Sequence, residues 1–97
     1  MNGVYRTSIN TPMGNLDIHI ALQQSGNTIN GMIEIMGGKH PLENGRVNGN
    51  RCFFMGELRN GAINLKYEIQ AELNQDVLNI YARTNMGEFK LQANKIG

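Results

Sequence analysis

Apolar and polar residues alternate most regularly along residues 62–73 of this chain. One side of the stretch carries Ile63, Leu65, Tyr67, Ile69, Ala71 and Leu73, and the other carries Asn64, Lys66, Glu68, Gln70 and Glu72. A period of two indicates a β-strand with one face in a core and the other in water. Such a strand needs partners for its edges and for its apolar face. We therefore expect the rest of the chain to supply further strands.

Shorter alternating segments, separated by glycine, asparagine and proline, lie on both sides of this stretch. They predict strands over residues 3–10, 15–23, 28–36, 51–58, 77–84 and 88–96. Pro41 predicts that residues 39–44 form an edge strand or an irregular crossing, and a short strand is expected through Arg46 and Val47. Gly31 falls on the core-facing side of its strand, where a missing side chain often marks a bend.

The connections between these segments are short, so strands that are neighbours in sequence are expected to pair antiparallel. The dipeptide Asn-Gly, the strongest short signal for a hairpin, occurs five times. The pattern predicts an all-β fold with a single domain over residues 1–97, a small up-and-down β-barrel of about eight strands. A β-sandwich is the alternative. Because the first and last segments are both strands, their pairing would close the barrel.

Charge, cysteine content and the length of apolar runs bear on which partners and which cellular compartment are expected. The formal net charge is +1, and the nine lysines and arginines are spread singly, which gives no field to recruit nucleic acid or an anionic membrane. Cys52 is the only cysteine, so no intramolecular disulfide forms and a reducing compartment is compatible. No secretory signal pattern and no apolar run of about 20 residues are visible. We expect a soluble, cytoplasmic protein.

Few residues in the sequence are candidates for metal binding or catalysis. The available metal ligands are Asp17, His19, Glu34 and His40, which lack any recognised ligand spacing, and the favoured interpretation is that they are surface residues. Cys52 alternates with the core set and is interpreted as a small buried hydrophobic residue. No spacing places a nucleophile beside a base, so we expect no catalytic residue, cofactor or metal.

Aromatic and basic residues alternate weakly in two of the predicted strands, at Arg51 with Phe53 and at Tyr81 with Arg83. Such alternation occurs in proteins that bind single-stranded nucleic acid. Without a net positive charge we expect no nucleic-acid partner.

A second apolar set lies on strand faces that the alternation assigns to solvent. Its members are Met32, Met36, Phe53, Met55 and Tyr81. An exposed apolar patch usually indicates an interface or a ligand surface. Three interpretations stay open: an interface between copies of the chain, a surface for a ligand, or a one-residue shift of register at a bulge, which would invert the faces.

Several turn motifs occur in a recognisable order. They are Thr-Pro-Met-Gly at residues 11–14, Gly26-Asn27, Ile29-Asn30-Gly31, the stretch NGRVNGN at residues 44–50, and Met-Gly-Glu-Phe at residues 86–89. This series resembles a family of uncharacterised modules of similar length, which occur alone or alongside flavin-dependent oxidoreductases of the old yellow enzyme type. The resemblance implies a calycin-like, lipocalin-like β-barrel and brings no catalytic residues. Family members often carry Gly-Asp where this chain has Gly26-Asn27 and Gly49-Asn50.

The sequence therefore predicts a non-enzymatic β-barrel that self-associates, most readily as a dimer, through the second apolar set. One alternative is a binding module for a small apolar ligand. Another, implied only by the resemblance, is an accessory module to a flavin-dependent oxidoreductase. The inward residues are largely isoleucine and leucine, so the interior of the barrel is expected to be filled by side chains.

Overall fold

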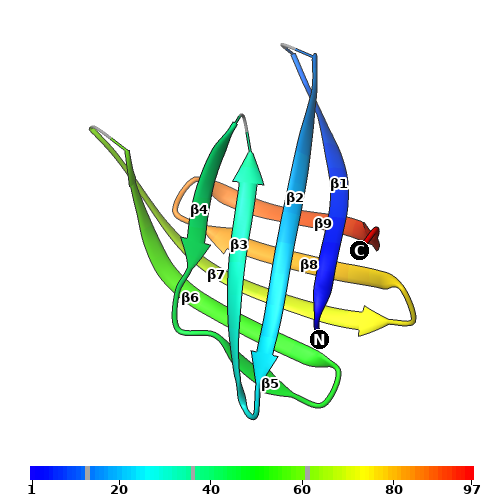
Figure 1. The fold of residues 1–97 in the computed structure, drawn as a ribbon. Helices are drawn as coiled ribbons and strands as arrows, with labels where there is room; N and C mark the ends of the chain where they lie inside the picture. The colour runs from blue at the N-terminus through cyan, green and yellow to red at the C-terminus, as the bar shows by residue number, and fades with distance from the viewer. Residues whose placement is uncertain (13, 36, 61) are drawn as a thin grey trace.

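A computed structural model describes residues 1–12, 14–35, 37–60 and 62–97, without the side chains of Thr11, Asn60 and Ile63. These residues form nine β-strands (Figure 1). Their bounds are β1 Gly3–Thr11, β2 Gly14–Ser25, β3 Thr28–Ile35, β4 Gly38–Leu42, β5 Arg46–Asn48, β6 Arg51–Asn60, β7 Ile63–Asn74, β8 Val77–Thr84 and β9 Gly87–Lys95. Every strand predicted from alternation is present, and β8 has the predicted bounds.

Eight strands close an antiparallel barrel, which confirms the predicted fold. Around the ring the order is β1-β2-β3-β5-β6-β7-β8-β9, and β9 returns to β1 through the pairs Tyr5↔Lys95 and Arg6↔Asn94. The ninth strand, β4, pairs along one edge with β3 and stands outside the ring. Pro41 lies in this strand, so the edge strand expected from the proline is confirmed.

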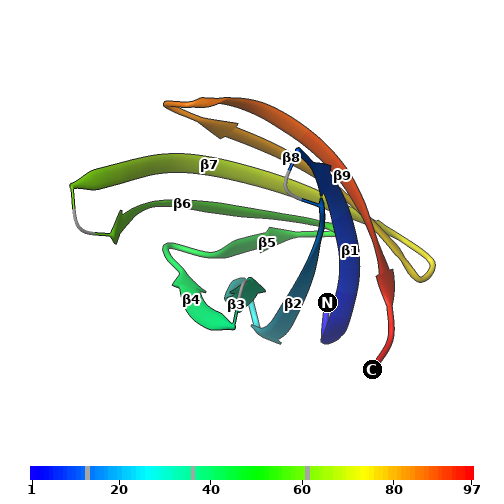
Figure 2. The same cartoon turned by 90° about the horizontal axis from the view of Figure 1, so that it is seen from above.

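The barrel consists of two halves that cross at a large angle. Strands β1–β4 form one half and β5–β9 the other, as Figure 2 shows from above. On one side the halves are joined by the two pairs between β1 and β9, and on the other by the single pair Thr28↔Arg46. Both joins lie at the same end of the barrel, which we call the closed end. At the opposite, open end the halves separate.

The burial of the inward side chains follows this arrangement. Tyr5, Cys52 and Leu78 are the largest fully buried side chains, and all three lie towards the closed end. Phe89 also faces inward but lies towards the open end, where its side chain is 48% exposed. Among the described residues, the side chains that seal the barrel therefore lie at the closed end.

The predicted assignment of strand faces is confirmed. On β6, Phe54 faces the interior and is buried, whereas its neighbour Met55 faces outward and is 58% exposed. A shift of register at a bulge is excluded for this strand, because its pairing with β7 runs without interruption from Arg51↔Glu72 to Asn60↔Ile63.

Gly31 is the inward residue of β3 that the sequence marked as unusual. A Cβ atom at this position would lie 2.9 Å from both Leu42 Cδ1 and Phe54 Cζ. The missing side chain therefore makes room for the Phe54 ring from β6 and for Leu42 from β4, where the two halves of the barrel meet.

Candidate functional site

The interior of the barrel contains a cavity of about 270 Å³. All strands except β5 contribute to its wall, which is mostly aliphatic. The lining residues are Ile9, Ile18, Ile20, Leu22, Ile33, Ile35, His40, Leu42, Cys52, Phe54, Leu58, Leu65, Tyr67, Ile69, Ala71, Leu78, Ile80, Ala82, Thr84, Phe89 and Leu91.

This cavity corrects the expectation of a filled interior. The two halves separate towards the open end, and the described side chains on opposite walls leave a cavity between them (Figure 2). Small inward residues add to the space, because Ala71 on β7 and Ala82 on β8 are part of the wall. Lining residues near the open end, such as Leu58, Leu65 and Phe89, keep part of their apolar surface exposed. The barrel is therefore an apolar cup.

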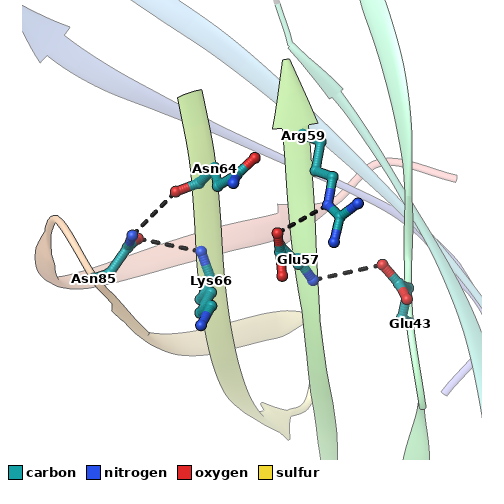
Figure 3. A network of polar contacts seen from close by, with 6 residues as sticks. All are labelled: Glu43, Glu57, Arg59, Asn64, Lys66 and Asn85. Atoms are coloured by element: carbon teal, nitrogen blue, oxygen red, sulfur yellow. Dashed lines mark hydrogen bonds and ion pairs between the residues drawn. The ribbon is translucent and has the colours of Figure 1, made fainter. Parts of the chain in front are cut away.

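The wall of the cup is incomplete between β4 and β6, at a boundary that we call the seam. Near the closed end the seam is bridged by hydrogen bonds. The Glu43 carbonyl accepts from Met55 N–H at 3.1 Å, and Asn44 Nδ2 donates to the Met55 carbonyl at 2.8 Å. Glu57 N–H donates to Glu43 Oε1 at 3.5 Å (Figure 3). Further towards the open end, the outer edge of β4 pairs with no strand among the described residues.

Three side chains in the wall carry polar groups other than the Cys52 thiol. Thr84 is satisfied locally, because its hydroxyl donates to the Gly87 carbonyl at 2.8 Å and accepts from Met86 N–H at 3.0 Å. The other two are Tyr67 on β7 and His40 on β4.

The Tyr67 hydroxyl reaches the seam from β7. It accepts a hydrogen bond from Glu43 N–H at 3.1 Å. Gly56 makes room for it, because a Cβ atom there would lie 2.5 Å from the hydroxyl oxygen. Burial raises the pKa of Tyr67, and this outweighs the lowering by the Glu43 hydrogen bond. The hydroxyl therefore keeps its proton at neutral pH, and no acceptor for that proton is found among the described residues.

His40 lies in the wall of the cavity, which corrects its interpretation as a surface residue. Its pairing with Ile33 places both side chains on the inner side of the sheet, where His40 is half-buried. In the part of the chain that the structure describes, its ring forms no hydrogen bond. The alternation around Pro41, with His40 and Leu42 two residues apart, is the signal that would have placed it inward.

The other candidate residues from the sequence do not form a reactive or metal-binding centre. Asp17 forms an ion pair with Arg6 at 3.2 Å on the outer face. Within the described ranges, no three His, Cys, Asp or Glu side chains are grouped to hold a metal ion. Cys52 is buried as predicted, and burial raises its pKa to about 11, so it stays a thiol rather than a nucleophilic thiolate.

The two basic residues of the aromatic–basic alternation form ion pairs with glutamate side chains. Arg51 Nε lies 3.0 Å from Glu72 Oε2, and Arg83 Nε lies 3.7 Å from Glu88 Oε1. Their charges are therefore compensated locally, and the described residues on the outer face of β6–β8 form no continuous row of unpaired cations.

In the structure, the described members of the second apolar set lie on two different parts of the barrel surface. Phe53 and Tyr81 lie on the outer face of β6 and β8, on either side of Gln70, and Met55 follows on β6. Met32 lies on the other half of the barrel, where it pairs with Ala21 and Pro41. Met36 lies outside the described residues. The set is therefore two separate areas, and only the group Phe53, Met55 and Tyr81 is continuous.

Tyr67 and Gly56 are the features of the wall that sequence reasoning missed. Tyr67 stands out in the sequence as the one inward residue of residues 62–73 with a polar group. Gly56 shares the inward parity of Cys52 and Phe54, but nothing local shows that a hydroxyl from the next strand occupies its place. That contact depends on the register between β6 and β7, where Gly56 and Tyr67 are direct partners.

None of the described residues belongs to a helix with the length and hydropathy of a membrane span. Comparison with protein-family models, curated proteins and solved structures finds no match to this chain. The function is therefore inferred from the geometry of the barrel.

Proposed function

We propose that this barrel binds a small, mostly apolar molecule in its interior. The observation that carries the proposal is the open cavity of about 270 Å³ with a mostly apolar wall. Apolar surface at its open end is exposed to water, and a ligand that covers it gains roughly 25 cal/mol for each Å² removed from water. Concave, mostly apolar sites with few polar groups are the usual form of small-molecule sites.

The size of the cavity limits the ligand. An apolar cavity of about 150 Å³ accommodates benzene. By the same ratio, the space inside this barrel suits a molecule of about ten carbon atoms. A single ring with a short chain fits this description, and a large lipid does not.

Binding is proposed without catalysis. The two side chains of the wall that could take part in nucleophilic chemistry are Cys52 and His40. The raised pKa of Cys52 keeps its thiol protonated and therefore weakly nucleophilic. The free thiol also supports a cytoplasmic location, because reducing compartments preserve free cysteines.

Methyl NMR spectra recorded during titration with butylbenzene, an uncharged molecule of suitable size, test the proposal. Signals of Ile18 and Ile80, which line the cavity, should shift in the wild type. In Ala82→Phe the added ring fills the cavity, and these shifts should disappear. Ala21→Phe is the matched control, since Ala21 is exposed on the outer face of β2, and it should keep them. Absence of shifts in the wild type, or equal shifts in Ala82→Phe, would refute the proposal.

Self-association is a separate proposal, supported by the outer-face group Phe53, Met55 and Tyr81, in which Met55 is exposed and the two aromatic residues are half-buried. This group is smaller than the second apolar set defined from the sequence, because Met32 faces another direction. A role beside a flavin-dependent oxidoreductase is supported by the resemblance alone.

A further inference from the structure

We infer that the ligand is an uncharged molecule whose one polar group is a hydrogen-bond acceptor, such as a carbonyl oxygen, placed at the seam. The inference rests on the proposed function and adds the chemical class of the ligand. It depends on two features of the wall, an unused hydroxyl proton and a nearby negative charge.

The unused proton belongs to Tyr67. Its side chain is only 5% exposed, and its hydroxyl accepts from Glu43 N–H but donates to no described residue. A buried donor without an acceptor costs free energy, which a ligand acceptor would recover. His40, on the β4 side of the seam, offers a second polar group, which has no hydrogen-bond partner among the described residues. The hydroxyl of Thr84 is already used on both sides.

The remaining wall restricts where a polar group of the ligand can lie. Towards the closed end the lining is apolar apart from the Cys52 thiol, a weak donor. A carbonyl placed there would lose its bonds to water with little compensation. The apolar end of the ligand therefore points to the closed end, and its acceptor points to the seam.

The negative charge at the seam disfavours a carboxylate as the polar group of the ligand. Glu43 contributes the backbone N–H that binds Tyr67, and its own carboxylate reaches across the seam to Glu57 N–H (Figure 3). The Glu43 carboxylate also raises the pKa of Tyr67, so its negative charge acts at the hydroxyl. Arg59 is bound to Glu57 at 2.9 Å, and Glu43 has no cationic partner among the described residues. An anionic head group at Tyr67 would be both desolvated and repelled.

A series of matched ligands tests the inference by NMR titration. Butylbenzene has no polar group, 4-phenyl-2-butanone has a carbonyl near the end of the same chain, and 3-phenylpropanoate has a carboxylate there. In Tyr67→Phe the ring stays and the hydroxyl is lost. We expect this variant to bind the ketone about threefold to tenfold more weakly than the wild type does. Its affinity for butylbenzene should be unchanged, which separates a lost hydrogen bond from a general change of the cavity.

Glu43→Gln tests the charge at an exposed position and keeps an acceptor for Glu57 N–H. It should strengthen binding of 3-phenylpropanoate and leave the ketone unaffected. If Tyr67→Phe binds the ketone as tightly as the wild type, or if the wild type prefers the carboxylate to the ketone, the inference is wrong. These outcomes leave the proposed function intact as long as butylbenzene binds. Failure of all three ligands to bind would overturn the proposed function itself.

Discussion

Two buried tyrosines differ in one respect, the partners of their hydroxyl groups. Tyr5 on β1 and Tyr67 on β7 are 0% and 5% exposed. The Tyr67 hydroxyl accepts a hydrogen bond from Glu43 N–H, whereas the Tyr5 hydroxyl is buried without a partner among the described residues. Because a buried polar group without a partner is costly, the two hydroxyls should have opposite effects on stability.

We predict that Tyr5→Phe raises the free energy of unfolding by about 1 kcal/mol and that Tyr67→Phe lowers it by a similar amount. Each variant keeps the aromatic ring, so the difference reports the hydroxyl alone. Unfolding in urea, followed by circular dichroism, measures both. Equal destabilisation by the two substitutions would show that the Tyr5 hydroxyl has a stabilising partner.

Cys52 makes stability depend on pH in the alkaline range. Burial raises its pKa from 9.0 to about 11, so the folded protein binds this proton more tightly than the unfolded chain does. The stabilisation is complete below about pH 9 and is lost as the pH rises towards about 11, with a total of about 3 kcal/mol. Burial also raises the pKa of Tyr5, which acts in the same direction.

Unfolding free energies measured across this pH range should fall less steeply for Cys52→Ala than for the wild type. Both proteins keep Tyr5, and because the Cys52 charge helps to raise the pKa of Tyr5, the difference reports Cys52 together with its effect on Tyr5. Parallel pH profiles would show that the folded thiol titrates like that of the unfolded chain.

At the scale of the strands, alternation predicted most of the structure. The longest predicted strand, residues 62–73, corresponds to β7 at Ile63–Asn74, and even the short β5 was expected through Arg46 and Val47. These elements were predictable because each carries its own apolar face. The function of an Asn-Gly pair was less predictable. Asn48-Gly49 forms a turn, with φ of 63° at the glycine, but Asn30-Gly31 lies inside β3.

The dipeptide itself does not distinguish these two pairs, although the alternation of residues 28–36 places Gly31 inside a strand. The difference comes from Phe54, more than twenty residues away from Gly31 in sequence, whose ring occupies the place of the missing side chain. This contact gives a prediction for β3. Gly31→Ala would place a Cβ atom 2.9 Å from Leu42 Cδ1 and Phe54 Cζ, and overpacking of this kind costs about 1–3 kcal/mol.

Asn30→Ala is the matched control for Gly31→Ala, since Asn30 is the exposed neighbour on the same strand and should change stability by less than about 0.5 kcal/mol. Urea unfolding of the two variants measures the difference. Similar values for both would mean that the barrel adjusts to an inward methyl group at no cost.

At the scale of the whole molecule, the sequence predicted a barrel with terminal strands that could close it, but not the cavity inside it. Alternation shows which side chains face inward, and it does not show how far apart the opposite walls lie. That distance depends on where the two halves are joined, by pairs such as Tyr5↔Lys95 and Thr28↔Arg46, and on their separation at the open end. His40 and Tyr67 meet the cavity only because of this separation, so the candidate site follows from the tertiary structure.

Self-association is also a property of the whole molecule, and the structure identifies the outer-face residue on which its prediction depends. If copies pair through Phe53, Met55 and Tyr81, then Met55, with 58% of its surface exposed, lies in the contact. A carboxylate at this position would have to lose its water without a positive partner. Native mass spectrometry should find twice 10.8 kDa for the wild type and 10.8 kDa for Met55→Glu.

Met86→Glu provides the control, because Met86 is an equally apolar, exposed residue in the turn between β8 and β9, away from β6. It introduces the same charge and should leave the dimer intact. A wild type that has the mass of a single chain would contradict the prediction, as would a dimer that survives Met55→Glu. In the second case the contact would lie elsewhere, and Met32, on the other half of the barrel, is the exposed apolar residue to substitute next.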